Sequence, residues 1–247
     1  MKKYRILSGN ALKLFAALFM VVDHVGVLFF PRVQLLRIIG RLAFPIFAFM
    51  IAEGAKYTKN KLRYFSFMAA LATICQIVYY FFDGGSLYMC ILVTFSLSLI
   101  MIFALDLFKK CLFSNERSAV IKALSFLPFA LSVGFVYLLN EYLTIDYGFA
   151  GSLVPVFASI VNFRGTDAPE SIKRYDTLYI RVLLFSVGLL ILSLSTGGVQ
   201  AFSLFALIPL LMYSEKRGKY NMKYFFYLFY PLHLVLLEGI YILLRII

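Results

Sequence analysis

The feature that most limits how this chain can fold is a series of long apolar segments separated by short polar loops. Nine segments can be drawn, at about residues 11–30, 35–55, 64–82, 88–108, 119–140, 148–163, 177–196, 199–213 and 224–246. A membrane-spanning helix needs roughly 20 residues, and the sixth and eighth segments are shorter than this, so between eight and ten spans fit the sequence.

Composition supports the same fold class. Hydrophobic residues make up 62% of the 247 residues and charged residues only 15%, which is more apolar surface than a soluble core can hide. The segments are continuous apolar runs and lack the alternation of a membrane β-barrel. We therefore expect an all-α, polytopic transmembrane helix bundle of about nine spans, forming a single domain over residues 1–247.

The net charge of +12 would indicate nucleic-acid binding in a soluble protein. Here the positive charges lie between the apolar segments. If the N-terminus is cytoplasmic, most of the 24 basic residues fall at the N-terminus and in the even-numbered loops, as the positive-inside rule requires. The charge pattern thus predicts a multi-pass cell-membrane protein with a cytoplasmic N-terminus, an odd number of spans and no nucleic-acid partner.

Several function classes lack their usual signatures. The three cysteines, Cys75, Cys90 and Cys111, are scattered and show no metal-site spacing, so we expect no metal. The sequence also contains no P-loop, no His-Glu-x-x-His motif and no nucleophile elbow. Phosphoryl transfer from a P-loop, zinc proteolysis and serine hydrolysis are therefore disfavoured.

Ionisable side chains inside the apolar segments are the candidate functional residues. A charge in hydrocarbon costs at least about 2.5–3.5 kcal/mol, so such residues face the protein interior or a water-filled cavity. They are Asp23 and His24 in the first segment, Arg37, Arg41 and Glu53 in the second, and His233 and Glu238 in the ninth.

The first two segments predict an ion pair beside a histidine. Arg37 and Arg41 share a helix face and enter the second segment from the side on which the first one exits. An ion pair between Asp23 and Arg41 would neutralise a costly charge, either as a structural link between helices or as part of a site. It would leave His24 free to take and give a proton.

Two prolines predict a cavity between kinked helices. Pro45 follows Arg41, and Pro231 lies close to His233. His233 is either a second proton-handling or hydrogen-bonding residue or a structural histidine. Glu53 either forms a local ion pair with the basic residues at 56–63 or contacts substrate. The residues from Asp146 to Gly151 predict a closely packed turn at the outer mouth.

Four stretches of the chain resemble the TraX family of integral membrane acetyltransferases. They are Leu12-Lys-x-x-Ala16 continuing to Met20-x-x-Asp-His-x-Gly26, Leu36-Arg-x-x-Gly-Arg-Leu-Ala-Phe-Pro-Ile-Phe-Ala-Phe49 with Glu53-Gly54, Asp146-Tyr-Gly-x-x-Gly151, and Phe226-Tyr-Leu-Phe-Tyr-Pro-Leu-His-Leu234. They span nearly the whole chain in the family's order.

The resemblance implies an acyltransferase-3-like bundle in the inner membrane that transfers an acetyl group from cytosolic acetyl-CoA. The acceptor would be an amine or hydroxyl, for example on a peptide N-terminus or a glycan; the family's namesake acetylates the N-terminus of conjugative pilin. The expected site residues are His24 as general base with Asp23 and Arg41 in catalysis, and Arg37, His233, Tyr230 and Glu53 in substrate binding. At the CoA phosphates we expect Lys56, Lys59, Lys61 and Arg63, or the basic cluster from Lys216 to Lys223.

Two other functions fit the same residues. A proton-coupled transporter would use the same buried histidines and charges, although the sequence shows no internal repeat. A structural membrane protein would use them only to hold its helices together.

Overall fold

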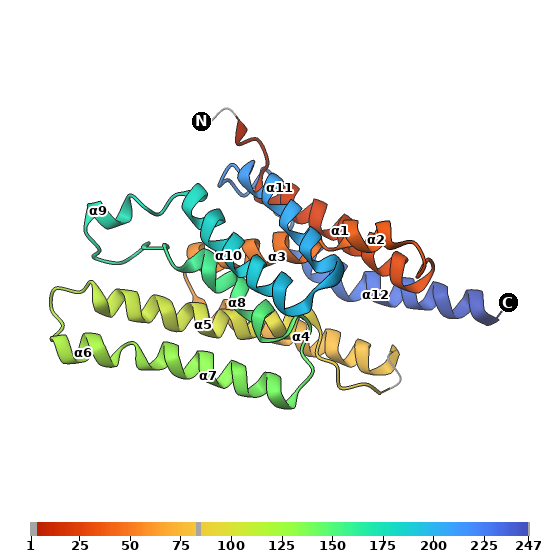
Figure 1. Cartoon of the computed structure of the whole chain (residues 1–247), viewed down its shortest axis with the longest axis horizontal. Helices are drawn as coiled ribbons and strands as arrows, with labels where there is room; N and C mark the ends of the chain where they lie inside the picture. Colours follow the sequence, from red (N-terminus) through yellow and green to blue (C-terminus); the bar gives the residue numbers. More distant parts are fainter. Residues whose placement is uncertain (1–3, 83–84, 247) are drawn as a thin grey trace.

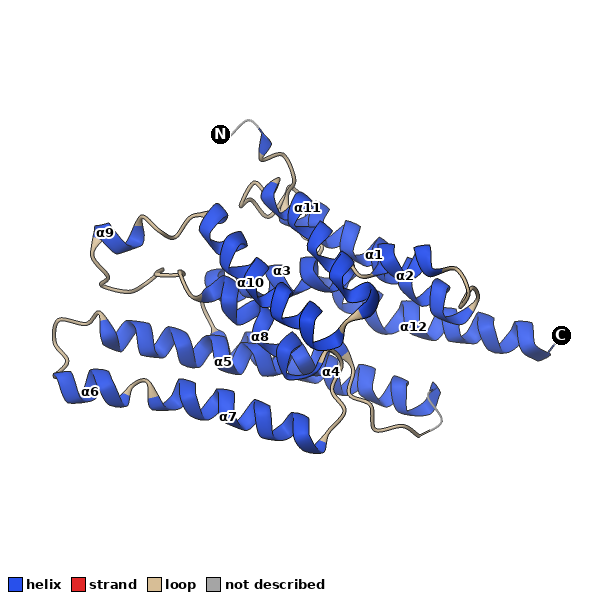
Figure 2. Cartoon of the chain, viewed as in Figure 1, coloured by secondary structure: helices blue, strands red, loops and turns tan. Residues whose placement is uncertain are grey.

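The computed structural model describes residues 4–82 and 85–246, which form an all-α helix bundle (Figures 1 and 2). Residues 1–3, which include both N-terminal lysines of the topology prediction, Lys2 and Lys3, lie outside the described residues. The elements are α1 (Gly9–Leu28), α2 (Gln34–Gly40), α3 (Ala43–Tyr57), α4 (Lys61–Phe82), α5 (Ile91–Leu112), α6 (Ala119–Leu124), α7 (Leu127–Tyr142), α8 (Gly148–Ser159), α9 (Glu170–Lys173), α10 (Leu178–Thr196), the 3₁₀-helix η2 (Gly198–Ala206), α11 (Leu207–Leu211) and α12 (Lys223–Ile246).

Every predicted apolar segment is helical, and the fold class is confirmed. Among the described residues, seven helical stretches are long and apolar enough to cross a membrane: 9–28, 34–57, 61–81, 91–112, 119–142, 178–196 and 224–244. The sixth and eighth segments form the shorter apolar helices α8 and η2–α11. Both short helices pack against α10 and α3 inside the bundle. Nine spans therefore stays a prediction.

The second predicted segment divides at the arginine that the sequence marks as functional. Pro45 has no N–H to donate to the carbonyl of Arg41, four residues earlier. The chain accordingly ends α2 at Gly40 and begins α3 at Ala43. The expected kink is thus a two-residue interruption at Arg41 and Leu42, within a helical stretch that runs from residue 34 to residue 57. In α12, by contrast, Pro231 is accommodated inside a continuous helix.

The helices differ in how much of their surface the protein covers. In the most apolar 18-residue stretch of α5, 61% is buried inside the structure, whereas the corresponding share is 17% in α4 and in α12. Figure 1 shows α7 along one edge of the bundle beside α5, and α12 on the other side near α1 and α2. Within the core, Phe49 of α3 packs edge-to-face on Phe185 of α10, with ring centres 5.4 Å apart. The uncovered apolar faces suit contact with lipid.

Two short backbone hydrogen-bonded contacts mark the two ends of the bundle. At one end, the amide of Leu7 donates to the carbonyl of Met212 over 2.9 Å, and Leu7 forms an isolated bridge with Tyr213. At the other, the amide of Asp146 donates to the carbonyl of Met89 over 2.9 Å. We call these the Tyr213 end and the Asp146 end. The predicted topology places the Tyr213 end in the cytoplasm.

A network of six charges, buried at its centre and partly exposed at its edges, links the segments at the Tyr213 end. Its centre is Arg181 at the start of α10, which is only 1% exposed. Its members pair as follows: Arg181 with Glu53, Glu215 and Asp176, Arg5 with Glu215, and Lys56 with Asp176. Three cations and three carboxylates balance, as burial of charge requires.

This network corrects one expectation from the sequence. The predicted local ion pair of Glu53 with the basic residues at 56–63 is wrong, because its carboxylate pairs with Arg181 of α10 instead. Sequence analysis missed Arg181, although an arginine inside the apolar segment 177–196 was a usable signal.

Candidate active site

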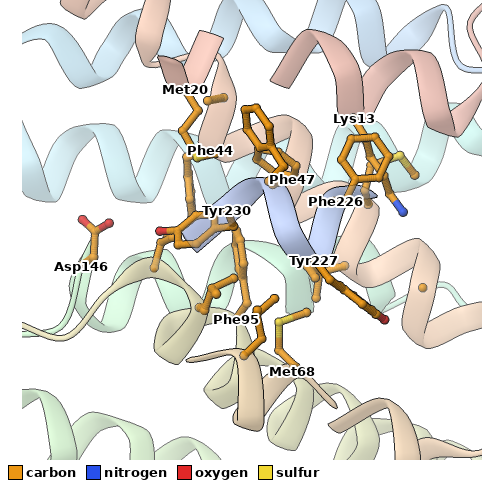
Figure 3. A pocket seen from close by; sticks show the side chains of 18 of the residues that line it. Lys13, Met20, Phe44, Phe47, Met68, Phe95, Asp146, Phe226, Tyr227 and Tyr230 are labelled. Atoms are coloured by element: carbon orange, nitrogen blue, oxygen red, sulfur yellow. The ribbon is translucent and has the colours of Figure 1, made fainter. Parts of the chain in front are cut away.

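A cavity of about 1100 Å³ runs between α1, α3, α4, α5 and α12. Its lining reaches from Asp146 and Asp23 at one end to Glu215 and Arg217 at the other. Figure 3 shows Asp146 and Lys13 on opposite sides of it, with Met20, Phe44, Tyr230 and Phe47 across the interval between them. The cavity thus extends along most of the bundle and has polar residues at both ends.

The predicted ion pair between the first two segments is present and is shared by two arginines. Arg37 Nη1 donates to Asp23 Oδ2 over 2.8 Å, and Arg41 Nη2 donates to both carboxylate oxygens of Asp23 over 3.2 Å. The pairing depends on Gly40, because a Cβ at that position would lie 2.2 Å from Asp23 Oδ1. The missing side chain therefore lets α2 approach α1 at the aspartate.

Arg41 also reaches two residues from distant parts of the chain. Its Nη1 donates to the hydroxyl of Tyr147 over 3.3 Å and to Gln200 Oε1 over 3.4 Å. Its Nε is buried and has no hydrogen-bond partner among the described residues. This N–H is therefore unsatisfied, while Arg41 as a residue lines the cavity. Gln200 was not found from the sequence, which offers no signal for a glutamine in η2.

The turn before α8 places Tyr147 against the arginine. Tyr147 has φ 60°, an unusual left-handed conformation for a bulky residue. Its ring stacks on Phe44 at 4.1 Å between centres, and a Cβ on Gly151 would lie 2.3 Å from the Cβ of Tyr147. The predicted close-packed turn is confirmed, and strained backbone and a glycine together hold this tyrosine.

Asp146 in the same turn is a second carboxylate at this end of the cavity. Tyr88 donates its hydroxyl proton to Asp146 Oδ1 over 2.7 Å, and Thr94 donates to the Asp146 carbonyl over 2.6 Å. Burial raises the pKa of the Asp146 carboxyl to about 6. The group therefore titrates in a range that a cell can reach.

His24 lines the cavity with a defined tautomer. Its Nδ1 lies 2.8 Å from the carbonyl oxygen of Met20, which can only accept, so Nδ1 carries the proton. In the neutral ring the lone pair is then on Nε2. Asp23 pairs with the arginines and not with its neighbour, as expected for adjacent helical residues that point about 100° apart. His24 is consequently able to accept a proton.

His233 lies behind His24. The two rings meet edge-to-face with centres 5.1 Å apart, and His233 Nδ1 lies 3.0 Å from the carbonyl oxygen of Phe229. His233 Nε2 is buried without a partner among the described residues, and the residue is absent from the cavity lining. Tyr230, which does line the cavity, has its ring 5.5 Å from that of His233. His233 therefore contacts His24, which lines the cavity, but does not line the cavity itself.

The basic residues predicted at the CoA phosphates separate into different environments. Lys56 donates to Asp176 over 2.6 Å and Lys61 to Asp106 over 2.9 Å, so both are engaged in ion pairs. Lys59 is exposed at the turn before α4 and lies outside the lining. Arg63 does line the cavity. In the part of the chain that the structure describes, no three His, Cys, Asp or Glu side chains gather in a way that could hold a metal ion.

Comparison with known proteins assigns the chain to a family. The family model described as TraX protein matches residues 8–241. Among curated proteins, a probable fimbrial assembly protein, FimC, of Dichelobacter nodosus is 27% identical over 255 residues, covering 93% of this chain and 94% of that protein. An uncharacterized protein of Rickettsia prowazekii (strain Madrid E) is 39% identical over 54 residues, covering 22% of this chain and 21% of that protein. No solved structure matches significantly. Since the family model covers nearly all of the sequence, the chain belongs to the TraX family.

Proposed function

We propose that this protein is an integral membrane acetyltransferase that moves an acetyl group from acetyl-CoA to an amine or hydroxyl acceptor. The observation that carries the proposal is the placement of His24. Its Nε2 lone pair is available, and the ring lines a cavity that continues to the Tyr213 end. Family membership and the name of the fimbrial assembly relative agree with modification of a surface-structure component.

The reaction requires one proton-accepting group and one group that stabilises negative charge. His24 Nε2 takes the proton from the acceptor nitrogen or oxygen as that atom attacks the thioester carbonyl. The carbon–sulfur bond then breaks, and His24 returns the proton to the CoA sulfur. The products are the acetylated acceptor and CoA.

Arg41 is the residue that we assign to the oxyanion. Its guanidinium lines a cavity in the bundle interior, where a fixed donor stabilises developing charge far more than it would in water. Asp23 and Gln200 hold the guanidinium in place, and Arg37 shares the aspartate. Asp23 is thus a positioning residue for the arginines rather than an orienting partner for the histidine.

The remaining predicted residues act at greater distance. His233 packs against the edge of His24 and fixes the ring from behind. Tyr230 lines the cavity and is placed to contact the substrate. Glu53 also lines the cavity but is held by Arg181, so we assign its main role to the charge network at the Tyr213 end.

The proposal includes a location. The protein sits in the inner membrane with its N-terminus and its Tyr213 end in the cytoplasm, where acyl-CoA is present. The acceptor reaches His24 from the Asp146 end. A peptide N-terminus suits the fimbrial relative's name, and a glycan hydroxyl suits the same chemistry.

The test is acetyl transfer by purified protein in proteoliposomes with labelled acetyl-CoA. His24→Ala should lower the rate by about 100-fold or more, the usual effect of removing a general base. Leu18→Ala, at a lipid-facing position of the same helix that is 57% exposed, is the matched control and should retain full activity. Undiminished transfer by His24→Ala would contradict the assignment. Absence of transfer by the wild type together with proton-coupled uptake would support a transporter instead.

A further inference from the structure

Two groups of cations at the Tyr213 end differ in their partners. Those in the first are committed to carboxylates: Arg5, Lys56, Lys61, Lys109 and Arg181. Those in the second line the cavity and form no ion pair with a described carboxylate: Lys13, Arg63 and Arg217. A cavity wall with three uncompensated cations is a place where an anion can bind.

Lys13 is the most informative of the three. It lies in the second turn of α1, inside an apolar stretch, where an unpaired ammonium is costly. Its side chain is half-buried, and Nζ lies 5.7 Å from the centre of the Phe226 ring. Arg217, in the loop before α12, lines the same cavity. A bound anion would stabilise the half-buried ammonium of Lys13.

Arg63 completes the group from α4. Its guanidinium carbon lies 5.8 Å from the centre of the Phe67 ring, and that ring stacks on Tyr227 of α12 at 6.0 Å. Three cations on α1, α4 and the loop before α12 thus surround one end of the cavity. Arginine and lysine in such an arrangement are the usual ligands of phosphate groups.

The distance from this end to His24 provides a second, independent argument. Lys13 and His24 are both on α1, separated by eleven positions, so they lie about 16 Å apart along the axis at 1.5 Å per residue. The pantetheine arm of CoA has about a dozen bonds between its phosphate oxygen and its sulfur. At 3.8 Å for three extended bonds, it spans about 15 Å.

We infer that Lys13, Arg63 and Arg217 bind the phosphate groups of the acyl donor and so set the position of its thioester at His24. This inference rests on the proposed acetyl transfer. Between the two ends, Met20, Phe47 and Phe226 provide an apolar wall for the arm. The cavity would therefore select its donor by the length between phosphate and sulfur.

The experiment compares two donors, acetyl-CoA and S-acetylpantetheine, which carries the same arm without phosphates. In phosphatidylcholine nanodiscs, Lys13→Gln should raise the KM for acetyl-CoA about tenfold or more, because a charge-assisted contact is lost. The KM for S-acetylpantetheine should not change. Lys13→Arg keeps the charge, so its KM for acetyl-CoA should be close to that of the wild type. Lys110→Gln, an exposed lysine outside the cavity lining, is the control and should behave as wild type.

The outcomes separate the possible failures. Equal KM increases for both donors, or no increase for either, would overturn the phosphate site while leaving acetyl transfer intact. If the KM values of the variants differ from wild type only when phosphatidylglycerol is added to the nanodiscs, the cations bind a lipid headgroup. That result would also overturn the phosphate site. If the wild type uses neither donor, the proposed function fails. Thermal stabilisation by CoA but not by pantetheine, lost in Lys13→Gln, would then still support the phosphate site, and equal stabilisation by both would refute it.

Discussion

Replacing Gly40 by alanine tests whether the contact between α1 and α2 sets the geometry of the site. A Cβ at this position would lie 2.2 Å from Asp23 Oδ1, 2.3 Å from its Cβ and 2.6 Å from its Cγ. Cβ contacts below 3.0 Å essentially never occur, so the two groups must separate by about 1 Å. The whole carboxyl side chain is in the way, and no flexible tip can move aside.

The magnitude follows from this displacement. Overpacking of a tight contact costs about 1–3 kcal/mol of folding free energy. A shift of about 1 Å also exceeds what the hydrogen bonds from Arg37 and Arg41 to Asp23, now 2.8 and 3.2 Å long, tolerate. A misplacement of this size can lower a reaction rate about 100-fold. We therefore expect Gly40→Ala to reduce both thermal stability and kcat, with kcat affected more.

The assay is acetyl transfer with labelled acetyl-CoA, read beside thermal unfolding of the same samples. Gly134→Ala is the matched control, since Gly134 lies in α7 and a Cβ added there would meet nothing within 4 Å. That variant should retain wild-type activity and stability. If Gly40→Ala were as active and as stable as Gly134→Ala, the reasoning about close approach at Asp23 would be refuted.

Three further predictions concern the charged groups. Arg181→Met should lower the free energy of unfolding by about 3–5 kcal/mol, because it leaves Glu53 buried and unpaired, and adding Glu53→Gln should recover part of this loss in chemical unfolding; a fully stable Arg181→Met would contradict the network. Since burial raises the pKa of Asp146 to about 6 from an ordinary 3.8, the folded state retains this proton longer than the unfolded state. Wild-type stability should thus fall by about 2 kcal/mol relative to Asp146→Asn as pH rises from 4 to 7, and parallel melting curves for the two proteins would refute the shift. Arg41→Lys should lower kcat at least about tenfold with little change in melting temperature, because one ammonium cannot reproduce the three-partner fork; unchanged kcat would exclude a role for the guanidinium geometry.

The fold was largely accessible from sequence because a bilayer imposes helix length and satisfied backbone hydrogen bonds. All nine apolar segments are helical, and the two short ones are the segments whose length departs from a full span. The interruption of the helix at Arg41 was harder to predict from the sequence. Pro45 predicts a disturbance, but whether a helix kinks or breaks depends on the tertiary contacts of the freed carbonyl.

Part of the candidate site could be predicted from the sequence. The link from Asp23 to Arg41 followed from one costly charge on each of two adjacent helices, and the structure confirms it with Arg37 added. The pairing of Glu53 could not be chosen from sequence, because nearby basic residues compete with Arg181, which lies 128 positions away. Gln200 joins the site through folding of a short 3₁₀-helix that leaves no periodic signal.

A structure of the protein with CoA bound in a lipid nanodisc would show the donor and His24 together. We expect the CoA sulfur within hydrogen-bonding reach of His24 and the phosphates beside Lys13, with the pantetheine arm extended along the cavity. A map that shows CoA elsewhere, or the His24 ring closed off from the bound thiol, would contradict it.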